Sequence, residues 1–278
     1  MVRKLYKHEF AALFKWVIPL NLICLLLSLL TKLNTVIAEN SPFEIVTVIV
    51  AVAYGISLIS LVAITFVVVV SRFYKNLLSQ EGYLTFTIPV SPITHIVCKL
   101  ICGSIAVLVS CIIAGLSLCV IVSSTLESAG VSAVFSEMAE IFTEIIGFEM
   151  EYIGTPRLVM LIVSYCITAV VTVMSGILFT YAAMALGQRS RRNRVASAVG
   201  WYFLIYIGRS IITSIYESIM SALSKGGDDS VFTVAERTMQ YVDALQVSTV
   251  INMIDGLVWG ALFFLITWHI LTKKLNLE

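Results

Sequence analysis

Residues that could do chemistry are few and widely spaced in this 278-residue chain. Its three histidines, His8, His95 and His269, do not cluster in the sequence, and there is no GxxxxGK motif followed by Ser or Thr. A metal site needs several convergent ligands, and a P-loop nucleotide site needs that glycine-rich motif. We therefore expect no catalytic residue, no metal site and no cofactor site in this chain. We place the three histidines at membrane interfaces.

The composition is that of a membrane protein. Hydrophobic residues make up 59% of the chain and charged residues 13%, and the mean hydropathy is +0.98. A soluble domain is about half apolar and about a quarter charged, and a membrane span needs ~20 mostly apolar residues. We predict an all-α integral membrane protein with one transmembrane domain over residues 1–278. The six predicted spans are 16–34, 44–71, 97–125, 156–187, 196–222 and 247–271.

The basic residues orient these spans. With the N-terminus inside, the inner segments hold thirteen of the 18 basic residues. Since Lys and Arg mark cytoplasmic loops, both termini are expected in the cytoplasm, with residues 127–155 and 224–246 as outer segments. The net charge of +1 argues against nucleic acid as a partner. The thirteen inner basic residues are Arg3, Lys4, Lys7, Lys15, Arg72, Lys75, Lys99, Arg189, Arg191, Arg192, Arg194, Lys273 and Lys274.

Two ionisable residues lie inside predicted spans, where a charge costs a few kcal/mol and usually faces protein or water. At ~1.5 Å per residue, Arg209 and Asp255 lie at depths that differ by about one helical turn. A long arginine side chain can bridge that difference. We therefore predict that Arg209 and Asp255 pair between the fifth and sixth spans, as a packing device rather than a substrate site.

Small residues at helical spacing predict close helix contacts in two spans. The sixth span contains Gly256 and Gly260 in a GxxxG spacing, and the third contains Ala106, Ser110 and Ala114. The spacing leaves open whether these contacts are made within one chain or between chains.

Two segments on the inner side have more specific patterns. Residues 3–14, RKLYKHEFAALF, have the pattern of an amphipathic helix on the inner membrane surface, which would serve as an anchor or as a platform for a cytosolic partner. Its apolar face holds Leu5, Phe10, Leu13 and Phe14, and its polar face holds Arg3, Lys4, Lys7 and Glu9. Residues 80–91, QEGYLTFTIPVS, link the second and third spans. We expect the second helix to continue to about Ser79, Gly82 to follow its end, and Ser91-Pro92 to start the next helix. Residues 72–96 are thus an ordered cytoplasmic link.

This layout resembles a bacterial permease of the ABC-2 transporter family. The resemblance rests on YKHEF at 6–10, Pro19, EGYLTFTIPVSP at 81–92 and Lys99, while Gln80 stands where many members have an acid. It implies that residues 72–96 are a coupling segment that docks on a separate ATPase subunit, which binds ATP and Mg²⁺. It also implies a second permease copy and a location in the bacterial cell membrane. The residues implied at the ATPase interface are Tyr6, Glu9, Glu81, Gly82, Tyr83, Leu84 and Phe86.

The function expected from this resemblance is ATP-driven export of an amphipathic molecule such as a peptide, lipid or drug. The chain itself is then a transport subunit and not an enzyme. The main alternative is a stand-alone immunity or sensor protein that binds a toxin or peptide in the membrane without ATP. A channel or an assembly factor is a further alternative.

Overall fold

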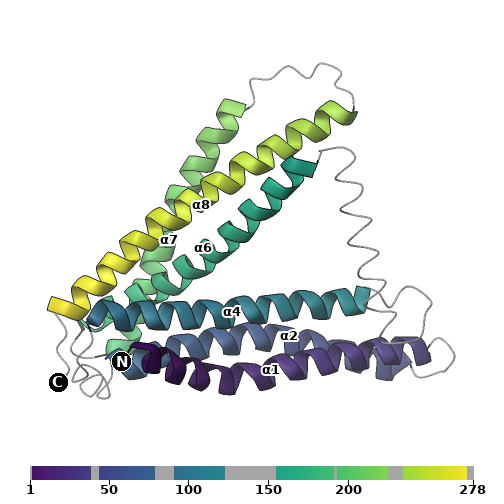
Figure 1. Cartoon of the computed structure of the whole chain (residues 1–278), viewed down its shortest axis with the longest axis horizontal. Helices are drawn as coiled ribbons and strands as arrows, with labels where there is room; N and C mark the ends of the chain where they lie inside the picture. Colours follow the sequence, from purple (N-terminus) through teal and green to yellow (C-terminus); the bar gives the residue numbers. More distant parts are fainter. Residues whose placement is uncertain are drawn as a thin grey trace. The chain divides into compact units, whose positions relative to one another are not determined.

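Six long helices make up nearly all of the computed structural model, which describes residues 2–38, 44–78, 91–122, 155–190, 193–224 and 234–273. Each of the six contains a stretch long and apolar enough to cross a membrane, so the prediction of a multi-pass helical membrane protein is confirmed. The described residues contain no β-strand. The helices are α1 (Val2–Ala38), α2 (Glu44–Phe73), α4 (Pro92–Val122), α6 (Thr155–Gly187), α7 (Arg194–Ser224) and α8 (Val234–Lys273) (Figure 1).

The largest extensions beyond the predicted spans are in α1 and α8. α8 begins at Val234 and not near residue 247. Residues 234–246 contain strong helix formers such as Ala, Glu, Met, Gln and Leu, so the helix continues past the apolar stretch that hydropathy detects. α1 runs without a break from Val2 to Ala38, with Pro19 inside it. The N-terminal segment and the first predicted span therefore form one helix.

The predicted start of the third helix is found, and the second helix reaches at least Leu78, the last residue described before the link. α2 is followed directly by a π-helical turn, η1 (Tyr74–Leu78), so helix continues to the residue before Ser79. Pro92 is the first residue of α4, and the Ser91 carbonyl accepts a hydrogen bond from the Thr94 amide at 3.0 Å. The Ser91 hydroxyl lies 2.8 Å from the Thr94 hydroxyl. Ser91 thus occupies the N-cap position of α4, as the sequence predicts, and its hydroxyl contacts the Thr94 side chain.

The helices form two compact units. The first comprises Met1–Arg72 and Val97–Glu151, and the second comprises Phe73–Ile96 and Tyr152–Glu278. The boundary therefore passes through the last residue of α2 and the first turns of α4.

Unit 1 is held together by polar contacts that take one residue from each of α1, α2 and α4. In one such layer Asn21 donates to the Ser110 hydroxyl at 3.3 Å, and the Thr65 hydroxyl lies 3.3 Å from the same atom. In a second layer the Ser117 hydroxyl lies 2.9 Å from the Tyr54 hydroxyl and accepts from the Cys24 thiol at 3.7 Å. Hydrogen bonds between membrane helices contribute about 0.6 kcal/mol each on average and fix the register of the helices.

The order of these contacts sets the direction of each helix in unit 1. From the first layer to the second, the residue numbers of the contacting side chains increase along α1 and along α4. Along α2 they decrease, from Thr65 to Tyr54. α1 and α4 are therefore parallel and α2 is antiparallel to both (Figure 1). Ala106, Ser110 and Ala114 are all buried, which confirms the predicted close contacts of the third span.

Unit 2 is built around α6, which packs against both α7 and α8. Its core contains aromatic pairs: the Phe73 and Tyr181 rings are stacked with centroids 3.7 Å apart, and the Phe179 and Phe263 rings are tilted with centroids 5.4 Å apart. α6 and α8 run side by side in Figure 1. Aromatic burial of this kind supplies much of the packing area in a helical unit.

The GxxxG spacing of α8 is used against α6 of the same chain. A Cβ atom added to Gly256 would lie 2.8 Å from Val171 Cγ1, and one added to Gly260 would lie 3.8 Å from Ser175 Cβ. Both glycines are buried. The predicted close helix contact is thus made within the chain, and Gly256 is where the approach of α8 to α6 leaves no room for a side chain.

Candidate functional site

A buried ion cluster joins α1, α2 and α4 in unit 1. Glu9 on α1 accepts hydrogen bonds at both carboxylate oxygens. Lys99 Nζ of α4 donates to Oε1 at 2.5 Å, and the Arg72 guanidinium of α2 donates to Oε2 at 3.0 Å. These partners are 90 and 63 residues away from Glu9 in sequence. One carboxylate therefore links three helices.

The cluster is largely removed from solvent. The side chains of Glu9 and Lys99 are 9% and 7% exposed, and that of Arg72 is 26% exposed. With one carboxylate and two cations, the three side chains carry a formal net charge of +1. A buried charge is tolerated only when it is paired and hydrogen-bonded, so each of the two cations depends on the single acid.

Local structure explains how the three side chains meet. Arg72 is the penultimate residue of α2, and Lys99 lies roughly two turns into α4, whose start is fixed by Ser91-Pro92. In sequence, Arg72 is the first residue of the predicted coupling segment 72–96, and Lys99 follows the end of that segment by three residues. Glu9 therefore connects both helices that lead into that segment to the N-terminal helix.

The residues implied at an ATPase interface are only partly within the described chain. Glu81, Gly82, Tyr83, Leu84 and Phe86 lie outside the described residues. Tyr6 is half-buried and lines a shallow hollow of about 420 Å³ between α1 and α4. Glu9 is only 7% exposed with both oxygens engaged, so its contacts are with Arg72 and Lys99 inside the chain.

The predicted intramembrane pair is present in unit 2. Arg209 of α7 donates to Asp255 Oδ2 of α8 at 3.0 Å, with the two side chains 31% and 40% exposed. The Arg209 guanidinium also lies 5.9 Å from the centre of the Trp259 ring, one turn along α8 from Asp255. An ion pair and a cation–π contact thus join α7 to α8.

We expect the Arg209–Asp255 pair to contribute a coupling free energy of about 1 kcal/mol. Polar pairs between membrane helices rarely exceed ~2 kcal/mol, and this pair is partly exposed. Arg209→Ala and Asp255→Ala should each lower the free energy of unfolding in detergent, while the double variant loses less than their sum. Losses that simply add would show that the two residues act independently.

The three histidines differ in burial. His8 and His269 are exposed, whereas His95 is only 1% exposed. His95 falls in the first turn of α4, in the part of that helix that belongs to unit 2. Over the described residues no three His, Cys, Asp or Glu side chains converge as a metal site would require.

The ion cluster was missed by sequence reasoning, which placed Glu9 with Arg3, Lys4 and Lys7 on a polar face of the N-terminal helix. A signal was nevertheless present. Glu9 is one of only three acids assigned to the inner side, among thirteen basic residues. A lone acid in such a segment is a candidate ion-pair partner for cations at the neighbouring helix ends.

Comparison of the chain with protein-family models, with curated proteins and with solved structures finds no match.

Proposed function

We propose that this chain is the permease subunit of an ATP-driven ABC exporter in the bacterial cell membrane. Two copies, or this chain and a related one, would form the translocation pathway, and separate ATPase subunits would bind ATP and Mg²⁺. The termini and the coupling segment 72–96 would lie in the cytoplasm. The observation that carries the proposal is the Glu9–Arg72–Lys99 cluster, which ties together the helices around that segment.

The mechanical argument concerns how movement of the coupling segment would reach the membrane helices. A partner that pushes on residues 79–90 would displace the adjoining ends of α2 and α4. Because Glu9 holds Arg72 and Lys99 to α1, the displacement would be passed to three helices together. Without the contacts to Glu9, the ends of α2 and α4 could move independently, and the displacement would not reach α1. Interfaces and packed helices transmit motion as rigid pieces, which suits an ATP-driven transport cycle.

Two sequence observations support the same proposal. The EGYLTFTIPVSP sequence at 81–92 resembles the coupling element of ABC-2 permeases, and the chain has no P-loop motif of its own. Tyr83 and Phe86 are the aromatic type that concentrates binding energy at protein interfaces, and Glu81 would offer a charge to the ATPase. The apolar helices suit an amphipathic substrate, and the acid-rich outer segment 127–155 suits a cationic peptide.

A co-purification experiment tests the proposal. The chain, solubilised in detergent from its native host, should bring down an ATPase, and the Glu81→Ala, Tyr83→Ala double variant should recover at least tenfold less. That loss corresponds to about 1.4 kcal/mol, within the range for interface hot spots. A Thr85→Ala, Thr87→Ala double variant in the same segment is the matched control and should retain the ATPase.

The opposite result also has a clear meaning. If no ATPase is recovered with the wild-type chain, the exporter proposal fails, and a stand-alone protein that binds a toxin or peptide becomes the better explanation. Equal loss in both double variants would show that the segment is needed for folding and would remove the support for specific docking by Glu81 and Tyr83.

A further inference from the structure

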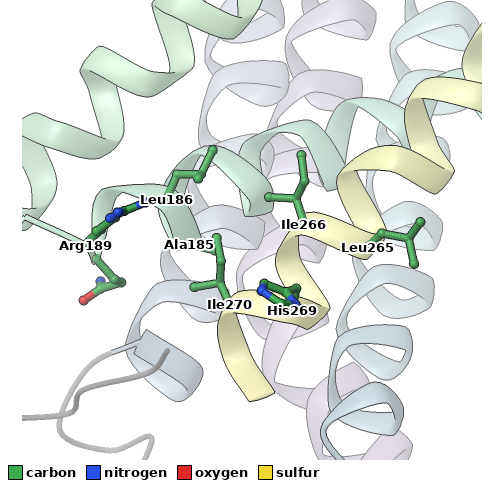
Figure 2. A pocket seen from close by; sticks show the side chains of 8 residues that line it. Ala185, Leu186, Arg189, Leu265, Ile266, His269 and Ile270 are labelled. Carbon is green, nitrogen blue, oxygen red and sulfur yellow. The ribbon is translucent and has the colours of Figure 1, made fainter. Parts of the chain in front are cut away.

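A cavity of about 370 Å³ lies in unit 2 between the C-terminal parts of α6 and α8. Figure 2 shows Arg189 on the α6 side and His269 on the α8 side, with Ala185 and Ile270 between them. The Arg189 amide donates to the Leu186 carbonyl at 3.1 Å in the turn that closes α6, which positions the arginine at the cavity. The lining residues are Ala185, Leu186, Gln188, Arg189, Leu265, Ile266, His269 and Ile270.

The polar groups of this cavity are suited to an anion. Arg189 offers the forked donors of a guanidinium, and His269 offers an imidazole N–H. The Gln188 Nε2 atom is buried and has no hydrogen-bond partner among the described residues. A buried amide donor without a partner costs free energy, so a ligand oxygen there would be stabilising. None of the eight lining residues is a carboxylate that would repel an anion.

The remaining walls are aliphatic, which distinguishes this cavity from a site for a small hydrated ion. Leu186, Leu265, Ile266 and Ile270 contribute branched apolar side chains. The volume is on the order of a dozen water molecules at ~30 Å³ each, so a free phosphate would occupy only a small part of it. A ligand that fits must combine an anionic group with apolar chains.

The cavity also lies at the end of α6 and α8 where basic residues are concentrated in the sequence, which favours an anionic ligand. Four arginines occur within residues 189–194, Lys273 is the last residue of α8, and Lys274 follows it in sequence. This charge distribution assigns the end to the cytoplasmic side, whose leaflet is rich in anionic lipids.

We propose that the cavity binds the phosphate headgroup of an anionic phospholipid, with Arg189, Gln188 and His269 around the phosphate and the aliphatic side chains against the acyl chains. The site is independent of the proposed transport function, since it requires no ATPase and no substrate. It would fix a lipid between α6 and α8.

Native mass spectrometry of the chain in a neutral detergent tests this site, with phosphatidylglycerol, phosphatidylcholine or inorganic phosphate added separately. The wild-type chain should retain one phosphatidylglycerol in preference to phosphatidylcholine. Arg189→Gln should weaken retention at least tenfold, and Ile270→Trp, which fills the cavity, should do the same. Arg3→Gln removes a charge from an exposed position that does not line the cavity and is the matched control, which should retain lipid as the wild type does.

Three results would overturn the proposal. Equal retention of phosphatidylcholine would remove the role of the anionic group. Inorganic phosphate that binds with the same dependence on Arg189, without retention of phosphatidylglycerol, would show a site for a soluble anion. Loss of lipid in Arg3→Gln equal to that in Arg189→Gln would show general charge attraction to the membrane. Failure to recover an ATPase would leave this experiment unaffected.

Discussion

Replacing Glu9 with alanine is expected to lower the free energy of unfolding by about 3–5 kcal/mol. That is the cost usually seen when one partner of a buried ion pair is removed and its counter-charge stays buried. Here two cations lose their common acceptor, and the Lys99 side chain is only 7% exposed. The measurement is unfolding of the purified chain in mixed micelles by titration with a denaturing detergent. His8→Ala, at the adjacent exposed position on α1, is the matched control and should change stability by less than ~0.5 kcal/mol.

The relative stability losses of the single variants show whether Glu9 is the common partner of Lys99 and Arg72 or whether the two contacts are independent. Lys99→Ala leaves Glu9 with Arg72, and Arg72→Ala leaves it with Lys99, so both should cost less than Glu9→Ala. Arg72 is the more exposed cation and its loss should cost the least. A Glu9→Leu, Lys99→Met double variant should recover part of the stability, since replacing a buried pair by apolar residues is often neutral. Equal effects of Glu9→Ala and His8→Ala would contradict the cluster.

The transmembrane spans could be predicted because their signal is local. A run of ~20 apolar residues is sufficient to indicate a span, and all six were found on that basis. Helix that continues into polar sequence gives no hydropathy signal, which is why the sixth span was predicted to begin at residue 247 although α8 begins at Val234. Ser91-Pro92 was read correctly because capping is also a local property.

Contacts between helices were predictable only where depth in the membrane restricted the choice. Arg209 and Asp255 could be paired because a fixed rise per residue placed both at similar depth inside spans, where an unpaired charge is costly. Glu9 lies near the end of its helix, where exposure to water is equally compatible with the sequence. Its burial depends on partners 63 and 90 residues away, and no local pattern encodes that. Likewise, GxxxG predicted close approach at Gly256 but not that α6 is its partner.

Gly187→Ala is expected to destabilise the chain by about 3 kcal/mol, although Gly→Ala within a helix is usually stabilising by ~0.5–1 kcal/mol. A Cβ at Gly187 would lie 2.5 Å from Ala198 Cβ and 2.6 Å from Ala198 Cα and N. Two of these three are backbone atoms, so no change of rotamer relieves the overlap, and α6 and α7 would have to separate. The measurement is the same detergent titration, compared with wild type.

The glycines of unit 2 form an internal series that tests this argument. Gly208 of α7 has no atom within 4 Å of an added Cβ, so Gly208→Ala should be neutral or slightly stabilising. Gly256→Ala should be intermediate, because its 2.8 Å contact is with one methyl group of Val171, whose β-branched side chain is stiff in a helix but not immovable. A stability of Gly187→Ala equal to that of Gly208→Ala would show that α6 and α7 are not in backbone contact at Ala198. We therefore expect the loss of stability to be largest for Gly187→Ala, smaller for Gly256→Ala and smallest for Gly208→Ala. This order depends on the type of atom that the added Cβ contacts as well as on distance, because a side chain can move to relieve an overlap and the helix backbone cannot.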